Sequence, residues 1–569
     1  METFLEEDQI SGKVLDHLGL VAATIKGLGL VDKIDERIPI STEKGAKATI
    51  GQRVSAMILN GLGFIDDRLY MFPEFLKNKP VDRLLGEGLC AEDFNDDALG
   101  RALDLIHGYG ETKLFGELAF EVGLKENLLG KSAHIDSSSL SVEGAYVEEE
   151  PATTSTTTGD AASEAPSDPP APRVLPKHGY SKDHRPDLKQ MVINLATTGQ
   201  AGFPIWMEAH SGNASDKKIL YEATQKMQTF CKQIEQAPAF LYVADSAMYD
   251  SCLQGGAATK WLSRVPEQHK AAKELLRLHD HDLSWTTLDD DYKICVVHTC
   301  YQGVHQRWCI VHSRPAYTRE GITLDKRIAR TKEEQDKALW HLGNQVFACE
   351  ADAQKAASAF EKTLKYHTVT WTIDPLMKHK GKGRPATGSA PEIHGYRVLG
   401  QLSSDQAKIE LLRRQKGRFI LASNEFDPEN LPDTAMLKEY KEQSKTEKGF
   451  RFLKDDAFEV SSIFLKKPER ITALMMVMTL CLMVYGVAEY KLRKSLIEAQ
   501  DTLPNQLNKP TQQPTMKWIY RLFHGVSLIR IQVEQRTQEI VINLTATLRK
   551  IIRYFGDHAL KIYGLVPTG

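Results

Sequence analysis

The chain has 569 residues, which is too long for one ordinary hydrophobic core and predicts several domains. An apolar content of 42% and a charged content of 26% are ordinary for a soluble globular protein. A net charge of −3 excludes a simple whole-molecule signal for nucleic-acid binding, but residues 491–569 carry 12 Lys and Arg against 5 Asp and Glu. This basic segment is compatible with a local phosphate-binding surface and equally with a solvated tail.

The eight cysteines form no CxxC pair, which argues against a zinc site or a disulfide framework and indicates reduced thiols. The first ten residues, METFLEEDQI, lack the basic and apolar regions of a secretory signal. We therefore expect a cytoplasmic protein.

Residues 1–128 predict a helical N-terminal domain. Thr49 and Asn95 each precede an amphipathic pattern and are expected to cap a helix. Short helices joined by tight turns are typical of a DNA-end-binding helix-turn-helix and also of a small helical bundle, and both interpretations stay open.

A first strand leads to Asp136, and the acidic segment 148–172 that follows is rich in Thr, Ser and Pro, which predicts a disordered loop. Residues 191–196 and 203–208 then predict a hairpin. A helix over 217–237 is expected next.

The apolar run 240–244 ends at Asp245 and predicts a buried strand. Residues 129–285 would thus form the first part of a catalytic core.

Residues 286–392 predict a β-rich insertion domain with one long helix over 331–366. Its basic loop contains Lys380, Lys382 and Arg384, which we interpret as a DNA clamp or, equally, as a solvated loop.

The α/β pattern returns over 393–490 as the second part of the core, with strands 396–400 and 418–423 and a long helix from Asp433. Residues 491–569 form the basic C-terminal segment, with a hairpin over 528–544 and a helix capped by Thr545.

The 18 uncharged residues Ile471–Ala488 reach the lower limit for a membrane span. The competing interpretation, which we favour, is a helix buried on all sides within a large domain. We therefore expect no membrane partner.

A strand hairpin, a helix and a buried strand ending in Asp follow the order of an RNase H-like sheet. Such a sheet brings two strand carboxylates together with a third from a later helix, and three carboxylates can hold two Mg²⁺ or Mn²⁺ ions. Taken singly, Asp245 could instead be a helix N-cap and Asp136 a turn residue.

In the segment LKEYKEQSKTEKGFRFLKDD, the residues Tyr440, Gln443, Glu447 and Lys454 are spaced so that one continuous helix would align them in a narrow stripe. Such a stripe suits contact with a phosphate backbone, and it is also an ordinary exposed polar face.

This spacing resembles the Tyr-x2-Arg-x3-Glu-x6-Lys signature of insertion-sequence transposases of the IS-four superfamily, with Gln443 in place of the arginine. The segment 178–190, which contains Lys182 and Arg185, is similar to the stretch that precedes the second strand in one branch of that superfamily. The resemblance spans nearly the whole chain. It implies an α/β fold in which an RNase H-like mixed sheet with helices is interrupted by a β-rich insertion domain and preceded by a helical domain.

The resemblance further implies a DDE transposase with Asp136, Asp245 and Glu447 as catalytic, metal-holding residues. Its partners would be the inverted-repeat ends of its element and target DNA, bound as a homodimer. Tyr440, Gln443, Lys454, Lys182 and Arg185 become candidate DNA contacts.

Gln443 loses the charge and bidentate geometry of the signature arginine, and Arg451 or Lys445 is the candidate to compensate. The alternatives are an RNase H-like nuclease without strand transfer and an inactive DNA-binding descendant.

Overall fold

The computed structural model describes residues 10–39, 45–63, 71–144, 146, 173–254, 259–379, 388, 390–455, 465–533 and 536–565. The chain divides into two compact units, one formed by Met1–Leu262 with Glu439–Gly569 and the other by Ser263–Lys438. The acidic segment 148–172 and the basic residues Lys380, Lys382 and Arg384 lie outside the described residues.

The first unit opens with a short strand and a set of helices. They are β1 (Ile10–Val14), α1 (Leu18–Leu28), α2 (Leu30–Arg37), α3 (Ile50–Gly61), α4 (Phe72–Lys77), α5 (Val81–Leu84), η4 (Ala91–Phe94), α6 (Asp96–Tyr109) and α7 (Glu111–Lys125). Both predicted caps are confirmed: the Thr49 hydroxyl accepts the Gln52 N–H at 3.1 Å, and the Asn95 side chain accepts the Ala98 N–H at 2.9 Å. The strand β1 was not expected.

A mixed sheet follows the helices. Its elements in chain order are β2 (Ser132–Val142), β3 (Lys189–Thr198), β4 (Phe203–Ser211), α8 (Asp216–Cys231), β5 (Leu241–Ala244), α9 (Ser246–Gln254) and β6 (Trp261–Arg264), the last at the boundary of the unit. The strands lie in the order β4-β3-β2-β5-β6, with β2, β3 and β4 antiparallel and β5 parallel to β2. The predicted hairpin and buried strand are confirmed.

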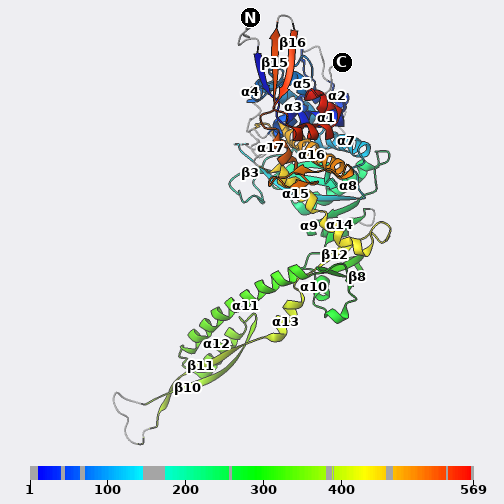
Figure 1. The fold of residues 1–569 in the computed structure, drawn as a ribbon. Helices are drawn as coiled ribbons and strands as arrows, with labels where there is room; N and C mark the ends of the chain where they lie inside the picture. The colour runs from blue at the N-terminus through cyan, green and yellow to red at the C-terminus, as the bar shows by residue number, and fades with distance from the viewer. Residues whose placement is uncertain are drawn as a thin grey trace, which may run out of the picture. The chain divides into compact units, whose positions relative to one another are not determined.

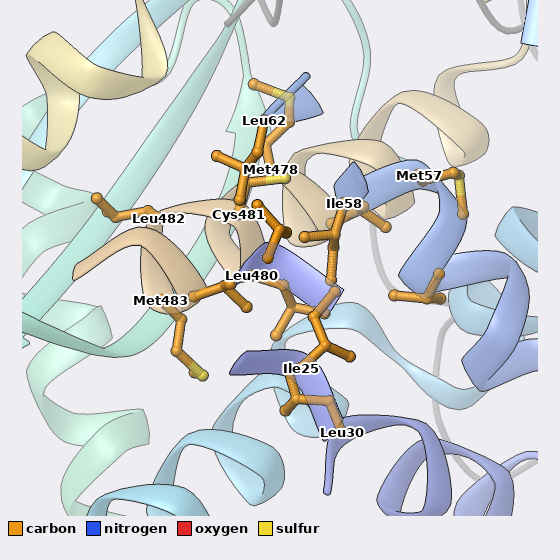
Figure 2. Close-up of a cluster of buried hydrophobic side chains, with 14 of the residues drawn as sticks. Ile25, Leu30, Met57, Ile58, Leu62, Met478, Leu480, Cys481, Leu482 and Met483 are labelled. Carbon is orange, nitrogen blue, oxygen red and sulfur yellow. The ribbon is translucent and has the colours of Figure 1, made fainter. Parts of the chain in front are cut away.

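The apolar segment 471–488 lies in α16 (Pro468–Glu498), a helix that is long and apolar enough to cross a membrane by length and composition. However, 83% of its most apolar stretch is buried within the chain. Figure 2 shows Met478 and Cys481 of this helix packed among Ile58 and Leu62 of the N-terminal region. The interpretation as a buried core helix is therefore confirmed.

The C-terminal segment adds β13 (Leu503–Pro504), β14 (Pro510–Thr511), α17 (Met516–Leu522), β15 (Ser527–Val533), β16 (Arg536–Ile542), α18 (Ala546–Tyr554) and α19 (Asp557–Ile562). The expected hairpin and the helix after Thr545 are present. Strand β15 also pairs with β1, and the Tyr563 hydroxyl donates to the Asp16 carbonyl at 2.6 Å. The first and last segments therefore share one core, although the sequence patterns predicted them as different domains.

The second unit contains an antiparallel set of strands in the order β12-β9-β8-β7 and a separate two-stranded ribbon of β10 and β11. Its elements are α10 (Lys270–Leu276), η5 (Asp280–Asp282), β7 (Thr286–Thr287), β8 (Tyr292–Tyr301), β9 (Val304–Ser313), α11 (Arg314–Gly343), α12 (Glu350–Glu361), β10 (His367–Lys378), β11 (Glu392–Ser404), α13 (Gln406–Arg414), β12 (Arg418–Ser423), η6 (Asp433–Ala435) and the first half of α14 (Met436–Lys441). In Figure 1 the helices α11 and α12 lie alongside the ribbon.

The single helix expected over 331–366 is wrong. Helix α11 starts at Arg314, where the Ser313 hydroxyl accepts the Ala316 N–H at 3.3 Å, and it ends at Gly343 before α12 begins at Glu350. The polar pattern carries too few apolar positions to mark either the start or the break.

Candidate active site on the mixed sheet

Two of the predicted catalytic residues lie side by side, Asp136 within β2 and Asp245 directly after the end of the neighbouring strand β5. In the parallel pair of β2 and β5, Ser132 lies opposite Leu241 and His134 opposite Val243. Continuing this register by two residues brings Asp136 beside Asp245, and neighbouring strands are separated by about 4.8 Å. Both side chains are half-buried. The sheet thus brings together two carboxylates that are more than 100 residues apart in the sequence.

The surroundings of Asp136 make its ionised form unfavourable. The pKa of this carboxyl is raised to about 6, mainly by burial and less by the charges of Asp245 and Asp216, while Lys182 and the Ser137 N–H act in the opposite direction. Burial disfavours a charged carboxylate because the protein interior solvates it less well than water does. A cation placed between the aspartates would relieve this cost.

The alternative role of Asp245 as a helix cap is also present. Its Oδ1 accepts the Ala247 N–H at 2.9 Å where α9 begins. The Oδ1 of Asp136 accepts the N–H of Ser137 at 2.8 Å. Each carboxylate has a second oxygen, so local capping and metal coordination are compatible roles.

The segment that carries the third carboxylate is not the continuous helix that the stripe required. Helix α14 ends at Lys441 and α15 (Ser444–Leu453) begins after a tight joint, in which the Gln443 N–H donates to Tyr440 and the Thr446 N–H donates to Gln443. The predicted long helix is wrong at this point. Consequently Gln443 is buried, at 8% exposure, whereas Glu447 is exposed.

Helix α15 is anchored directly on β2. The Thr446 hydroxyl donates to the His134 carbonyl at 3.1 Å, and the Gln443 amide donates to the Ile135 carbonyl at 3.3 Å. The hydroxyls of Thr446 and Thr197 are 2.7 Å apart. The joint between α14 and α15 therefore contacts the two residues of β2 that directly precede Asp136.

The helix covers the face of the sheet to which Asp136 belongs. Across the β2–β3 pair, Thr197 is opposite His134 and Leu195 is opposite Asp136, and opposite residues share a face. A Cβ placed on Gly449 of α15 would lie 3.1 Å from the Leu195 side chain. Glu447 thus belongs to the helix that packs over the same face as Asp136.

The acidic side chains of the site meet the ligand needs of the expected metal ions only in part. Within the described part of the chain, no three His, Cys, Asp or Glu side chains lie close enough together to hold a metal. The two aspartates fit as a pair of hard oxygen ligands. Glu447 does not complete a three-residue ligand group with them in this conformation.

A network that the sequence reasoning missed fixes the same joint. Glu439 accepts a hydrogen bond from the Ser132 hydroxyl and lies 3.3 Å from Nε2 of His134, which is buried. The hydrogen bond with His134 is the main reason that the pKa of Glu439 is lowered. No spacing signal links residues 132 and 439, so only the fold brings them together.

The predicted DNA contact Lys182 lies close to the aspartate pair. Its Nζ donates to the Ser137 carbonyl at 2.6 Å and is 3.3 Å from Asp216. A pocket of about 420 Å³ adjoins this position, lined among others by Ser138, Lys182, Asp216, Lys217 and Ala247. Asp216 was not singled out from the sequence, where it reads as an ordinary acidic residue in the first turn of a helix.

The other candidate DNA contacts differ in how exposed their side chains are and in whether they already form ion pairs. Arg185 is exposed and forms a two-pronged ion pair with Asp187, and Lys454 pairs with Asp183 at 2.7 Å. Arg451 is exposed and has no ion pair with any residue that the structure describes. Tyr440 is half-buried.

Gln443 is turned to the backbone of β2, and its Oε1 is buried without a hydrogen-bond partner. As it stands, this side chain supports the helix joint rather than a surface that DNA could reach.

Comparisons with known proteins give limited matches. A family model described as a domain of unknown function (DUF4277) matches residues 10–120, which contain β1 and the N-terminal helices. No curated protein sequence matches the chain.

Among solved structures, the piggyBac transposase in a synaptic complex with hairpin DNA, determined by cryo-EM, is similar at a TM-score of 0.35 and 8% identity, over 90% of this chain and 82% of that one. A match at this level carries no argument about chemistry.

Proposed function

We propose that this chain is a DNA transposase that cuts the ends of its own element and joins the freed 3′-OH to target DNA. The observation that carries the proposal is the parallel register of β2 and β5, which brings Asp136 beside Asp245 when it is continued by two residues. The transposase signature around Glu447 supports it, because α15 packs over the same face of the sheet. We assign the mixed sheet to the RNase H-like class on the same grounds.

In this proposal Asp136 and Asp245 hold divalent Mg²⁺ or Mn²⁺. Such ions activate water and stabilise the leaving oxygen of a phosphodiester. Glu447 would join the aspartates through a local adjustment of α15, since its helix is already attached to β2 at Thr446. The raised pKa of Asp136 means that a proton competes with the cation at this carboxylate near neutral pH.

The remaining residues of the site position the DNA. Lys182 lies within the electrostatic reach of Asp136 and could neutralise a phosphate that approaches the aspartates. Arg451 offers an unengaged guanidinium on α15, and Lys454 could exchange Asp183 for a phosphate. Two element ends must be cut together, so we propose that the active form is a homodimer in the cytoplasm.

The test is a cleavage and strand-transfer assay on DNA that carries the ends of the encoding element, with Mg²⁺ or Mn²⁺. Asp136→Ala, Asp245→Ala and Glu447→Gln should each lower cleavage at least 100-fold and leave DNA binding largely intact. Glu442→Gln on the helix joint and Asp250→Asn in α9 are matched controls that should cleave normally.

The outcomes separate the alternatives. Nicking without joining would replace the transposase with a nuclease, and DNA binding without metal-dependent nicking would indicate an inactive descendant. Full cleavage by Glu447→Gln would remove that residue from the proposed site.

A further inference from the structure

A second pocket in the first unit lies among the N-terminal helices and contains an arginine that pairs with no carboxylate in the described part of the chain. The pocket has a volume of about 720 Å³, and its lining includes Lys47, Arg53, Asn95, Ala98, Arg101 and Leu105. Arg53 belongs to α3, and Ala98 and Arg101 belong to α6. None of these residues belongs to the carboxylate site.

Arg53 is 4% exposed, and no carboxylate of the described chain forms an ion pair with it. One nitrogen, Nη1, donates to the Ala98 carbonyl at 3.2 Å, while Nε is buried with no hydrogen-bond partner. Burial, and then the nearby charge of Arg101, lower the pKa of Arg53. A buried guanidinium with unused donors is costly, because it has lost water and gained no anion in exchange.

Two of the acidic residues that line the pocket, Asp93 and Asp104, are already engaged. Asp104 forms a two-pronged ion pair with Arg470 at 2.7 Å. Asp93 accepts the Cys90 N–H at 2.9 Å and lies 4.0 Å from Lys47. Glu92 also lines the pocket and is exposed. The cationic groups that these ion pairs leave for a ligand are therefore the buried Arg53 and the exposed Arg101.

We propose that this pocket binds a phosphate group, held by Arg53 at its base and by Arg101 at its rim. Arginine suits this ligand because its planar fork of donors matches the oxygens of a phosphate. The volume exceeds that of a single phosphate and lies in the range of ligand pockets, about 300–1,000 Å³. The phosphate can belong to a DNA backbone or to a free phosphorylated compound, and the proposal does not depend on the function of the aspartate pair.

The experiment uses the full-length chain and measures binding of inorganic phosphate by calorimetry, together with the melting temperature in phosphate and in chloride at equal ionic strength. Phosphate should raise the melting temperature of the unmodified chain. Arg53→Met should weaken phosphate binding about 10- to 100-fold, as expected for lost charge-assisted hydrogen bonds. Arg553→Gln removes the same charge from the exposed face of α18 and should bind phosphate normally.

A second readout separates a ligand-binding role from a structural one. Because no carboxylate among the described residues pairs with Arg53, Arg53→Met in chloride should melt at the same temperature as the unmodified chain or higher. A lower melting temperature in chloride, or phosphate binding equal to that of the unmodified chain, would overturn the proposal. So would the absence of phosphate binding by the unmodified chain, which would mean that water alone solvates Arg53.

A competition experiment then identifies the source of the phosphate. Displacement of bound phosphate by a short DNA duplex, with a smaller salt dependence of DNA binding in Arg53→Met, would assign the pocket to the DNA backbone. Displacement by a nucleoside monophosphate and not by the duplex would assign it to a free phosphorylated compound. Either result supports a phosphate site.

Discussion

The raised pKa of Asp136 leads to a quantitative prediction about folding stability. A carboxyl whose pKa is about 6 in the folded chain and 3.8 in its ordinary state favours the protonated form on folding. The contribution of Asp136 to the free energy of unfolding is therefore fully present below about pH 4, and it is lost as the pH rises through about 6. The difference corresponds to about 2–3 kcal/mol, allowing for the partial exposure of the side chain.

The perturbation is Asp136→Asn, which removes the charge and keeps the shape. In a chelating buffer at pH 7.5, this variant should be more stable than the unmodified chain by about 2–3 kcal/mol. The gain should fade as the pH falls toward 4.5, where the carboxyl of the unmodified chain is protonated in the folded state. Functional sites commonly carry such a stability cost.

The assay is urea unfolding at several pH values, followed by circular dichroism. Asp32→Asn on the exposed face of α2 removes the same charge away from the sheet and should show no comparable gain at pH 7.5. Mg²⁺ should stabilise the unmodified chain and not Asp136→Asn. A destabilised Asp136→Asn, or a gain that does not depend on pH, would refute the electrostatic account of the site.

Further predictions concern the attachment of α15 and the core. Gly449→Val should lower stability by about 1–3 kcal/mol and reduce cleavage, because an added Cβ meets the Leu195 side chain at 3.1 Å. Gly486→Ala on α16 has open space around the added Cβ and should be tolerated. Equal melting temperatures of the two variants would contradict this prediction. Glu439→Gln should cost about 1–2 kcal/mol at pH 7, and since the pKa of Glu439 is lowered, the loss should shrink as the pH falls from the ordinary pKa of glutamate through the lowered one; a loss that does not change with pH would argue against it. Leu480→Ala in the core of Figure 2 should cost about 2–5 kcal/mol in urea unfolding, and a loss below 1 kcal/mol would mean that α16 is not tightly packed.

Local features of the fold were predictable from the sequence. The caps at Thr49 and Asn95, the hairpin of β3 and β4, and the strand that ends before Asp245 all depend on neighbouring residues, and each was confirmed. The pairing of β1 with β15 was not predictable, because it joins residues more than 500 positions apart and the β1 pattern is too short to indicate a strand.

The helix break after Lys441 was also hidden from the sequence. No glycine or proline marks it, and the segment 436–453 reads as one amphipathic pattern. The break arises from tertiary contacts, in which the buried Gln443 and Thr446 bind carbonyls of β2. The aspartate pair could be expected from the strand order, whereas the roles assigned to the residues around Glu447 depended on a straight helix.

The position of α16 bears on how the protein is made. The N-terminal helices end at Lys125, but the helix that fills their core begins at Pro468, so a ribosome must add roughly 340 residues before it emerges. At a synthesis rate of about 5–20 residues per second, the apolar faces of the N-terminal helices stay without α16 for roughly 20–70 seconds. During that interval the nascent chain is a natural client for chaperones. Fragments that stop before Pro468 should aggregate when expressed alone.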